Sequence, residues 1–264
     1  GKQWAALLHV NVEQPAFPEG VDAAELLYIA GFYLGDGFIR RWVGKSKKVV
    51  IFGVNDAKVA AFTRRVTRHV TVLNEKTGPR IQLASTAIAD WLIANFGERS
   101  HAKTLPAWVL AHPDRAALMD GYRDTDGHTT SNGWRSISVS RELAYGVRDL
   151  AQTLGMVASV AFTKTAPTTV IDGRTVTQRD YWTISAFNRS SSRKSRVRHG
   201  LLLRTASSFA PTKAAPVFNI EVEGDNSYIL DGAIVHNCQA FSVAGMREGL
   251  NDPRGQLTIK FVEL

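Results

Sequence analysis

The 264 residues suffice for one large hydrophobic core or two small ones, and the 44% hydrophobic and 21% charged content is ordinary for a soluble globular protein. No apolar run approaches the roughly 18 residues that a membrane span requires, and no signal peptide opens the chain, so no membrane partner is expected. Cys238 is the only cysteine, which excludes an internal disulfide and a zinc site of several thiolates and favours a cytoplasmic location.

The chain is basic, with a formal net charge of +8 and a pI near 9.7. This balance indicates a polyanionic partner, because Lys and Arg release counterions from phosphates. The alternative is that the basic residues only aid solubility. The chain opens with Gly1 and not with Met, so we interpret it as a fragment or a processed product.

The predicted elements begin after a tail over 1–20, in which 4–12 is a strand candidate. Asn55, Ser85 or Thr86, and Asp114 are the expected helix caps. The elements expected from there on are a helix over 21–34, a strand over 47–54, a helix to about 69, a strand over 80–84, a helix to 96 and a helix over 114–125.

After residue 127 the same order returns, which predicts two similar halves. The expected elements are a strand over 134–139, a helix from Ser140 to 154, and strands over 156–163 and 181–187. The basic, serine-rich tract 189–198 is either a solvated linker or an arm that contacts phosphates. Further on, 217–224 and 227–235 predict two short strands joined at Asp225-Asn226.

Two helices end in Asp-Gly, in IAGFYLGDG at 29–37 and MDGYRDTDG at 119–127. Small residues four apart lie on one helix face and allow close packing, and the glycine after each aspartate can adopt the left-handed cap. If the helices pack side by side, Asp36 and Asp126 meet at one edge of the interface. Both the helix dipoles and their mutual repulsion oppose two carboxylates there, and a divalent cation, best Mg²⁺, would remove both penalties.

These motifs resemble those of the LAGLIDADG homing endonucleases in their single-chain, monomeric form. The resemblance implies an α+β, pseudo-twofold molecule whose curved antiparallel sheets bind the major groove of double-stranded DNA. It also implies that Asp36 and Asp126 are catalytic, Mg²⁺-binding acids, although Leu34 replaces the earlier aspartate of the first motif. The residues expected to contact DNA are Arg40, Arg41, Lys47, Lys48, Arg135, Arg141, Arg193 and Arg196.

The segment HAKTLPAWVL at 101–110 resembles the block that supplies a lysine near the scissile phosphate in intein endonucleases. Lys103 is therefore a candidate catalytic residue that polarises water or neutralises charge in the transition state. An exposed lysine before a Pro-containing turn is the alternative, and Lys164 is the positional candidate in the second half.

The segment VFNIEVEGDNSYILDGAIVHNC at 217–238 resembles the C-terminal splicing region of inteins, which have the β-rich Hint fold. In this chemistry Asn237 cyclises, His236 assists and Cys238 accepts the upstream extein. Asn226 stands where many inteins have a histidine. No N-terminal splicing region is recognisable before residue 21, so we expect the chain to need a missing N-terminal intein half and N-extein as partners.

After the junction, CQAFSVAGMREGLNDPRGQL resembles the nucleophile motif of DNA cytosine-5 methyltransferases. There the cysteine adds to a flipped-out base. S-adenosylmethionine would be a cofactor of the complete host enzyme only.

The predicted organisation is thus a tail over 1–20, a LAGLIDADG endonuclease over 21–205, the C-terminal Hint segment over 206–237 and the start of the C-extein over 238–264. Two rival hypotheses stay open. One is a catalytically dead intein remnant that only binds DNA, and the other is simply a fragment of a DNA methyltransferase.

Overall fold

The computed structural model describes residues 13–41, 46–76, 78–171 and 173–188, and the backbone of four further short strands. By its internal contacts the chain divides into two units, Gly1–Thr205 and Ala206–Leu264. In the first unit, helices and antiparallel sheets together give the expected α+β class.

The first half of this unit is built around a buried helix, α2, and a four-stranded antiparallel sheet. Helix α2 begins after Asp22, whose side chain accepts a hydrogen bond from the Glu25 backbone. The elements are α2 (Ala23–Asp36), β1 (Gly37–Arg41), β2 (Lys48–Gly53), α3 (Asp56–Arg65), β3 (Thr71–Glu75), β4 (Gly78–Leu83) and α4 (Thr86–Phe96).

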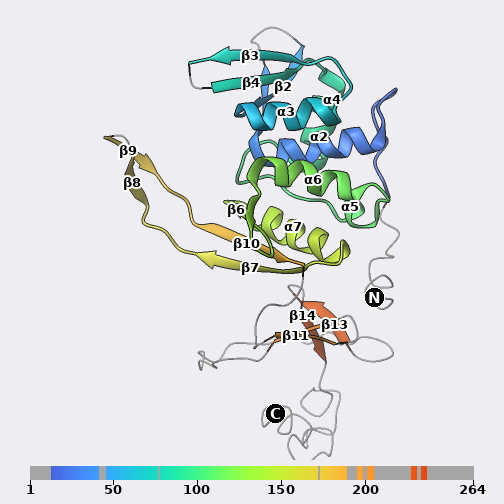
Figure 1. Cartoon of the computed structure of the whole chain (residues 1–264), viewed down its shortest axis with the longest axis vertical. Helices are drawn as coiled ribbons and strands as arrows, with labels where there is room; N and C mark the ends of the chain where they lie inside the picture. Colours follow the sequence, from blue (N-terminus) through green and yellow to red (C-terminus); the bar gives the residue numbers. More distant parts are fainter. Residues whose placement is uncertain are drawn as a thin grey trace, which may run out of the picture. The chain divides into compact units, whose positions relative to one another are not determined.

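The second half repeats this plan after a short helix, α5 (Ala107–Ala111). Its elements are α6 (Arg115–Asp126), β5 (His128–Thr130), β6 (Gly133–Ser138), α7 (Arg141–Thr153), β7 (Val157–Thr163), β8 (Thr168–Ile171), β9 (Arg174–Thr177) and β10 (Tyr181–Phe187). Strands β8 and β9 pair only with each other and extend the β7–β10 ribbon as a projecting arm (Figure 1).

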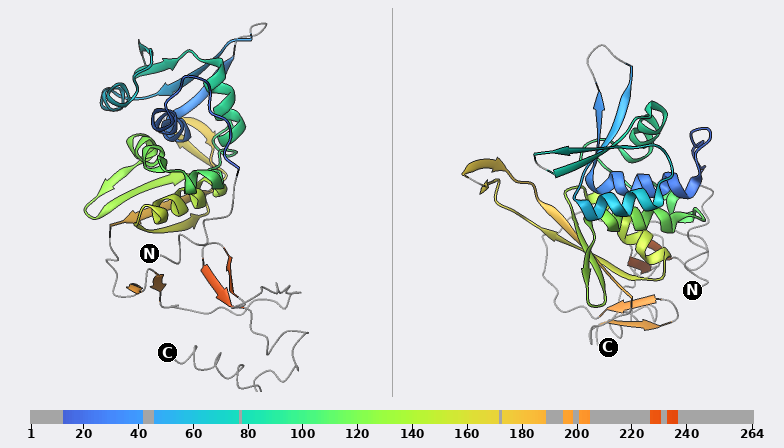
Figure 2. Two further views of the ribbon diagram at one scale, coloured as in Figure 1. Left: turned by 90° about the vertical axis from the view of Figure 1, so that its right-hand side faces the viewer. Right: turned by 45° about the horizontal axis from the view of Figure 1, so that its top comes forward.

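The two sheets have the same topology, with strand orders β1-β2-β4-β3 and β5-β6-β10-β7. Each half therefore runs helix, strand, strand, helix, strand, strand, which confirms the expected repeat and extends it. Strands β1, β3, β5, β8 and β9 were missed. Strand β1 follows α2 directly, without a turn, at the glycine that was expected only to stop the helix. In the views of Figures 1 and 2, the pair α2 and α6 lies between the two sheets.

Alternation along the strands determines which face of each sheet is covered. In β6, Trp134 and Ser136 are buried while Arg135 and Ile137 are exposed. Helix α7 packs on β7 and β10, so the opposite face of this sheet carries the exposed side chains. That open face is the surface available to a large partner.

The second unit contains one described element pair, the hairpin of β13 (Ser227–Leu230) and β14 (Ala233–His236). The expected single strand over 227–235 is therefore wrong, because the chain reverses between Leu230 and Ala233. Residues 217–224 and the proposed junction at 237–238 lie outside the described residues. So do 1–12 and most of the tract 189–198, in which β11 (Ser195–Arg198) pairs with β12 (Leu201–Arg204).

None of the helices in the described ranges is long and apolar enough to cross a membrane.

Candidate active site

Helices α2 and α6 approach each other closely because glycines face the partner backbone. A Cβ atom on Gly31 would lie 1.9 Å from the Leu118 carbonyl oxygen, and one on Gly121 would lie 2.1 Å from that of Tyr28. These contacts are related by the same shift of 90 residues that separates Asp36 from Asp126. The interface is thus pseudo-symmetric, and larger side chains at either glycine would force the helices apart.

The same symmetry brings the two motif aspartates to one end of the interface, since Asp36 ends α2 and Asp126 ends α6. A Cβ atom on Gly35 would lie 2.1 Å from Thr125 Oγ1 and 3.3 Å from the carboxyl carbon of Asp126. The side chain of Asp126 therefore reaches over the last turn of α2. The sequence-based expectation that the acids converge is met in this geometry.

The glycines after the aspartates do not form left-handed caps, contrary to expectation. Gly37 and Gly127 have φ of −90° and −76° and lead straight into strands. Their small size is needed for space, because a Cβ atom on either would come within 2.5 Å of the backbone of Tyr33 or Arg123.

The acid pair is electrostatically strained. Burial, followed by the charge of Asp36, raises the pKa of Asp126 to about 6, while Lys58 and Lys103 act in the opposite direction. Lys58 Nζ lies 2.5 Å from Asp36 Oδ2 and forms an ion pair with it. Sequence reasoning missed Lys58, whose place beside Asp36 depends on α3 packing and leaves no local signal.

Lys103 is buried and does not face solvent as a free cation. Its ammonium donates hydrogen bonds to the carbonyl oxygens of Tyr33, Leu34 and Gly37, at 2.5, 3.2 and 2.9 Å. Burial lowers the pKa of Lys103 to about 8, partly offset by the nearby Asp126 and Asp36. Its backbone carbonyl accepts a hydrogen bond from Ser140 Oγ at 2.6 Å. In this structure Lys103 closes the C-terminal end of α2, where a positive charge is favourable.

A hollow of about 610 Å³ opens beside Asp36. Basic side chains from both halves line it, namely Arg99, His101, Lys103 and Arg179, together with the carboxylates of Asp36 and Glu98. The basic side chains suit an anionic group such as a phosphate. Of these basic residues, only Lys103 was singled out from the sequence.

The donor set fits a hard divalent cation such as Mg²⁺. The two carboxylates supply oxygen ligands, and burial together with the charge of Asp36 raises the pKa of Asp126, a penalty that a bound cation would offset. Among the described residues no group of three or more His, Cys, Asp or Glu side chains gathers as a ready-made metal cage. Asp36 and Asp126 would therefore hold the ion together with substrate oxygens and water.

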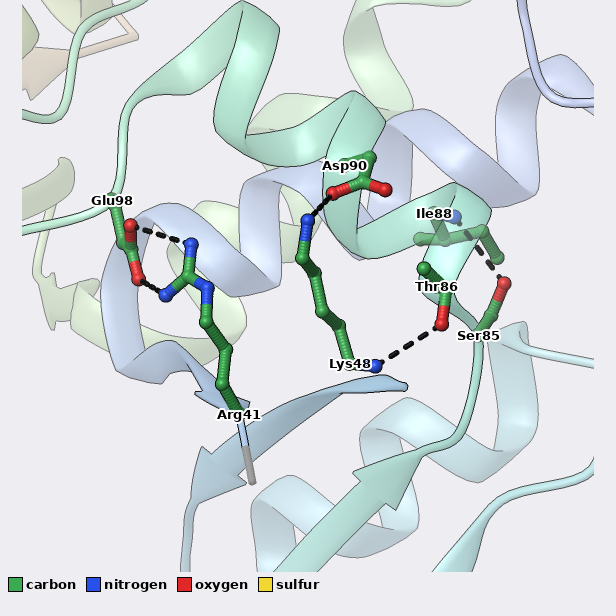
Figure 3. Close-up of polar contacts among 7 residues, drawn as sticks. All are labelled: Arg41, Lys48, Ser85, Thr86, Ile88, Asp90 and Glu98. Atoms are coloured by element: carbon green, nitrogen blue, oxygen red, sulfur yellow. Dashed lines mark hydrogen bonds and ion pairs between the residues drawn. The ribbon is translucent and has the colours of Figure 1, made fainter. Parts of the chain in front are cut away.

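The basic residues expected on the DNA-facing sheets are divided between the two faces of the first sheet. Arg41 pairs with Glu98, which follows α4, and Lys48 pairs with Asp90 of α4, so both point to the helix-covered face (Figure 3). The expectation for these two is corrected, because side chains alternate along a strand and Arg40 is the basic residue of β1 that points to the opposite face. Lys47 is exposed in the loop before β2.

In the second half, Arg135 lies on the open face of its sheet, as expected. Arg141 begins α7 and lies with its guanidinium 4.6 Å from the Tyr145 ring centroid, away from that face. Lys164 is exposed. The side chains of Arg193, Arg196 and His236, and all of Asn237 and Cys238, lie outside the described residues.

The ionisation of Asp126 should make stability depend on pH. Because its folded pKa lies above the unfolded value, stability is present at low pH and is lost as pH rises from about 4 through about 6. Asp126→Asn should therefore raise the free energy of unfolding on the order of 2 kcal/mol at about pH 8, without metal, and by much less at about pH 4. Urea unfolding at both pH values measures this.

Glu19→Gln, at an exposed carboxylate outside α2 and α6, is the control for removing one negative charge. An equal gain for Asp126→Asn at both pH values would show that ionisation of Asp126 is not the cause.

No protein-family model matches the chain. An iron–sulfur cluster assembly SufBD family protein of Mycobacterium leprae is 31% identical over 174 residues, or 61% of this chain and 19% of that protein. A SufBD family protein of Mycobacterium tuberculosis is 24% identical over 231 residues, or 82% and 27%. The ATP-dependent DNA helicase Hel308 of Thermococcus kodakarensis is 25% identical over 207 residues, or 69% and 18%. The chain thus spans about a fifth to a quarter of the length of these curated relatives.

A further match is shorter and has a higher identity. Over 27 residues, or 10% of this chain, the sequence is 70% identical to the DNA N-6-adenine-methyltransferase of Escherichia phage P1, of which it covers 4%.

Homing endonucleases are found among the similar solved structures. A variant of I-DmoI in complex with its target DNA has 12% sequence identity and a TM-score of 0.44, over 62% of this chain and 88% of that chain. I-WcaI bound to its DNA recognition sequence has 14% identity and a TM-score of 0.40, over 69% and 86%.

Proposed function

We propose that this chain is a site-specific DNA endonuclease that hydrolyses phosphodiesters with a divalent cation held by Asp36 and Asp126. The observation that carries the proposal is the pseudo-symmetric glycine interface between α2 and α6, which brings the two carboxylates together despite their repulsion. Two carboxylates held together in this way are unfavourable unless a cation and a substrate bind there, so the pair indicates a functional site.

Each part of the site has a role in this proposal. When bound, the cation supplies positive charge that activates water and stabilises the leaving oxygen. Asp36 and Asp126 hold it, and Lys103 fixes the end of α2 from which Asp36 projects. The hollow lined by Arg99, His101 and Arg179 accepts phosphate, while the open sheet faces contact DNA.

The direct test is incubation of the protein with a pool of random-sequence duplexes and Mg²⁺, followed by sequencing of the new ends. Ends that share one sequence context support a site-specific endonuclease. Retention of selected duplexes without new ends would favour the rival hypothesis, a DNA-binding remnant without catalytic activity.

We further propose that the endonuclease belongs to an intein. Its curated relatives are named for iron–sulfur cluster assembly and for DNA unwinding, which have no chemistry in common, yet each aligns with most of this chain over a small part of its own length. A mobile insertion that removes itself from its host explains a segment shared by otherwise different proteins. The His236-Asn237-Cys238 sequence would be its downstream splice junction, with the roles given above.

The host would then be a DNA methyltransferase, which begins again at Cys238. The 27 residues from Cys238 to Leu264 equal in number those matched in the phage methyltransferase. The name of that relative gives adenine as its base, whereas the sequence motif resembles cytosine-5 enzymes. The proposed host is a cytosine-5 enzyme, because Cys238 suits addition to a pyrimidine ring.

Cys238→Ser in a reassembled full-length precursor should separate the two proposed roles of this residue. A serine hydroxyl still accepts an acyl group, so spliced product should form more slowly. It is a far poorer nucleophile toward cytosine, because almost none of it is ionised at neutral pH, so the spliced protein should not methylate DNA. Gel analysis of splicing and mass analysis of methylated bases in the DNA measure the two steps.

Full 5-methylcytosine formation by the spliced serine variant would disprove the dual role. Formation of N6-methyladenine by the wild-type product would instead place the host with the phage relative by activity.

A further inference from the structure

We propose that Lys58 occupies, in the DNA-free protein, the place at Asp36 that the divalent cation takes during catalysis, so that metal binding requires its displacement. This inference rests on the proposed endonuclease function.

The contact between Lys58 and Asp36 is direct and can exchange. Nζ and Oδ2 are 2.5 Å apart, and the two side chains keep 24% and 23% exposure. The backbone of Lys58 is fixed in the first turn of α3, where its N–H donates to the Asn55 cap. From this fixed base, the flexible four-carbon stem allows the ammonium to swing into solvent while the helix stays in place.

Lys103 cannot play this part, although the family resemblance makes it the candidate catalytic lysine. All three of its donor positions are used by backbone carbonyls in a buried setting. Withdrawing it would break three hydrogen bonds in the interior, which is unfavourable. Of the two lysines beside the acids, only Lys58 is therefore exchangeable.

The balance of charge explains why an exchange is needed. In the free protein, two carboxylates and two ammonium groups cancel, so the site attracts an incoming cation only weakly. After Lys58 leaves, the buried Lys103 offsets one carboxylate and the remaining negative charge faces the cation. The loaded site is then net positive, which suits a DNA phosphate.

The exchangeable lysine is found in the first half of the molecule. In α7 the matching position, whose backbone donates to the Ser140 cap, is Leu143. Leu143 is buried in the core and carries no charge. The exchange therefore acts on the Asp36 side of the pair.

Calorimetric titration of the DNA-free protein with Ca²⁺, which uses the same oxygen donors as Mg²⁺, tests the proposal without any cleavage. Lys58→Met and, as a more polar variant, Lys58→Gln should bind Ca²⁺ about three- to fivefold more tightly than wild type, the scale for removing one partly exposed charge contact. Arg64→Met is the matched control, because Arg64 is an exposed cation on the same helix. Its Ca²⁺ affinity should equal that of wild type.

Three results would overturn the proposal. The Lys58 variants could bind Ca²⁺ no more tightly than wild type, Arg64→Met could show the same gain, or the gain could survive a second change, Asp36→Asn, which would place the ion elsewhere. Failure of the endonuclease proposal is seen separately, as absent DNA cleavage by wild-type protein with Mg²⁺.

Discussion

Asp36→Asn and Asp126→Asn should each abolish DNA cleavage, with a loss of at least about a thousandfold in rate, because the lost cation contributes several kcal/mol to the transition state. DNA affinity should stay the same or rise, since a negative charge beside the phosphates is removed. Cleavage of a selected duplex with Mg²⁺ and binding of the same duplex with Ca²⁺ measure the two effects.

The matched control is Asp124→Asn. Asp124 belongs to the second motif but accepts a hydrogen bond from Tyr28 at 2.7 Å, and Leu34 stands at the equivalent place in the first motif. Its removal should leave cleavage largely intact. Near wild-type cleavage by Asp36→Asn or Asp126→Asn would refute the assignment of the acids.

DNA affinity should fall steeply with salt, by on the order of 10³–10⁵ between about 50 and 200 mM if roughly 6–10 phosphates are contacted. Arg135, exposed on the open face of β6, should contribute to the slope of log affinity against log salt concentration. If Arg135 contacts a phosphate, Arg135→Gln should reduce the magnitude of this slope by about one unit. Fluorescence anisotropy over a salt series gives the slope for each variant.

Arg41→Gln serves as the comparison, because Arg41 is paired with Glu98 on the helix-covered face. Its slope should match that of wild type. A lower slope for Arg41→Gln than for Arg135→Gln would show that DNA lies on the other face of the first half. Deletion of 189–198 would test whether this tract is an arm or a linker.

Local signals were sufficient to predict much of the fold. Side chains of Asn55, Ser85 and Ser140 accept the hydrogen bonds expected of N-caps, and the helices start where these residues predict. Asp114 stands at the start of α6 without such a bond. Two of the strands that were missed, β1 and β5, lack a boundary of their own, since they emerge directly from helices that end in Asp-Gly.

The candidate site was predictable only in its symmetric part. Two motif copies at a fixed separation predicted that Asp36 and Asp126 converge. The burial of Lys103 and the contact of Lys58 with Asp36 arise from tertiary packing between segments tens of residues apart. No periodicity or spacing in the chain encodes such contacts, so they required the structure.

The connection between the halves has a consequence for dividing this chain into complementing fragments. Lys103 reaches back with its side chain to the carbonyls that end α2, while its own carbonyl accepts a bond from Ser140 in the second half. A break placed near 112–114 would leave Lys103 with the helix that it closes, and of the hydrogen bonds made by Lys103 only the one to Ser140 would have to be restored on reassociation. A break before Lys103 would strip α2 of its cap and leave Asp36 on a frayed helix end. The chain should therefore tolerate a break between α5 and α6, and not a break between α4 and Lys103.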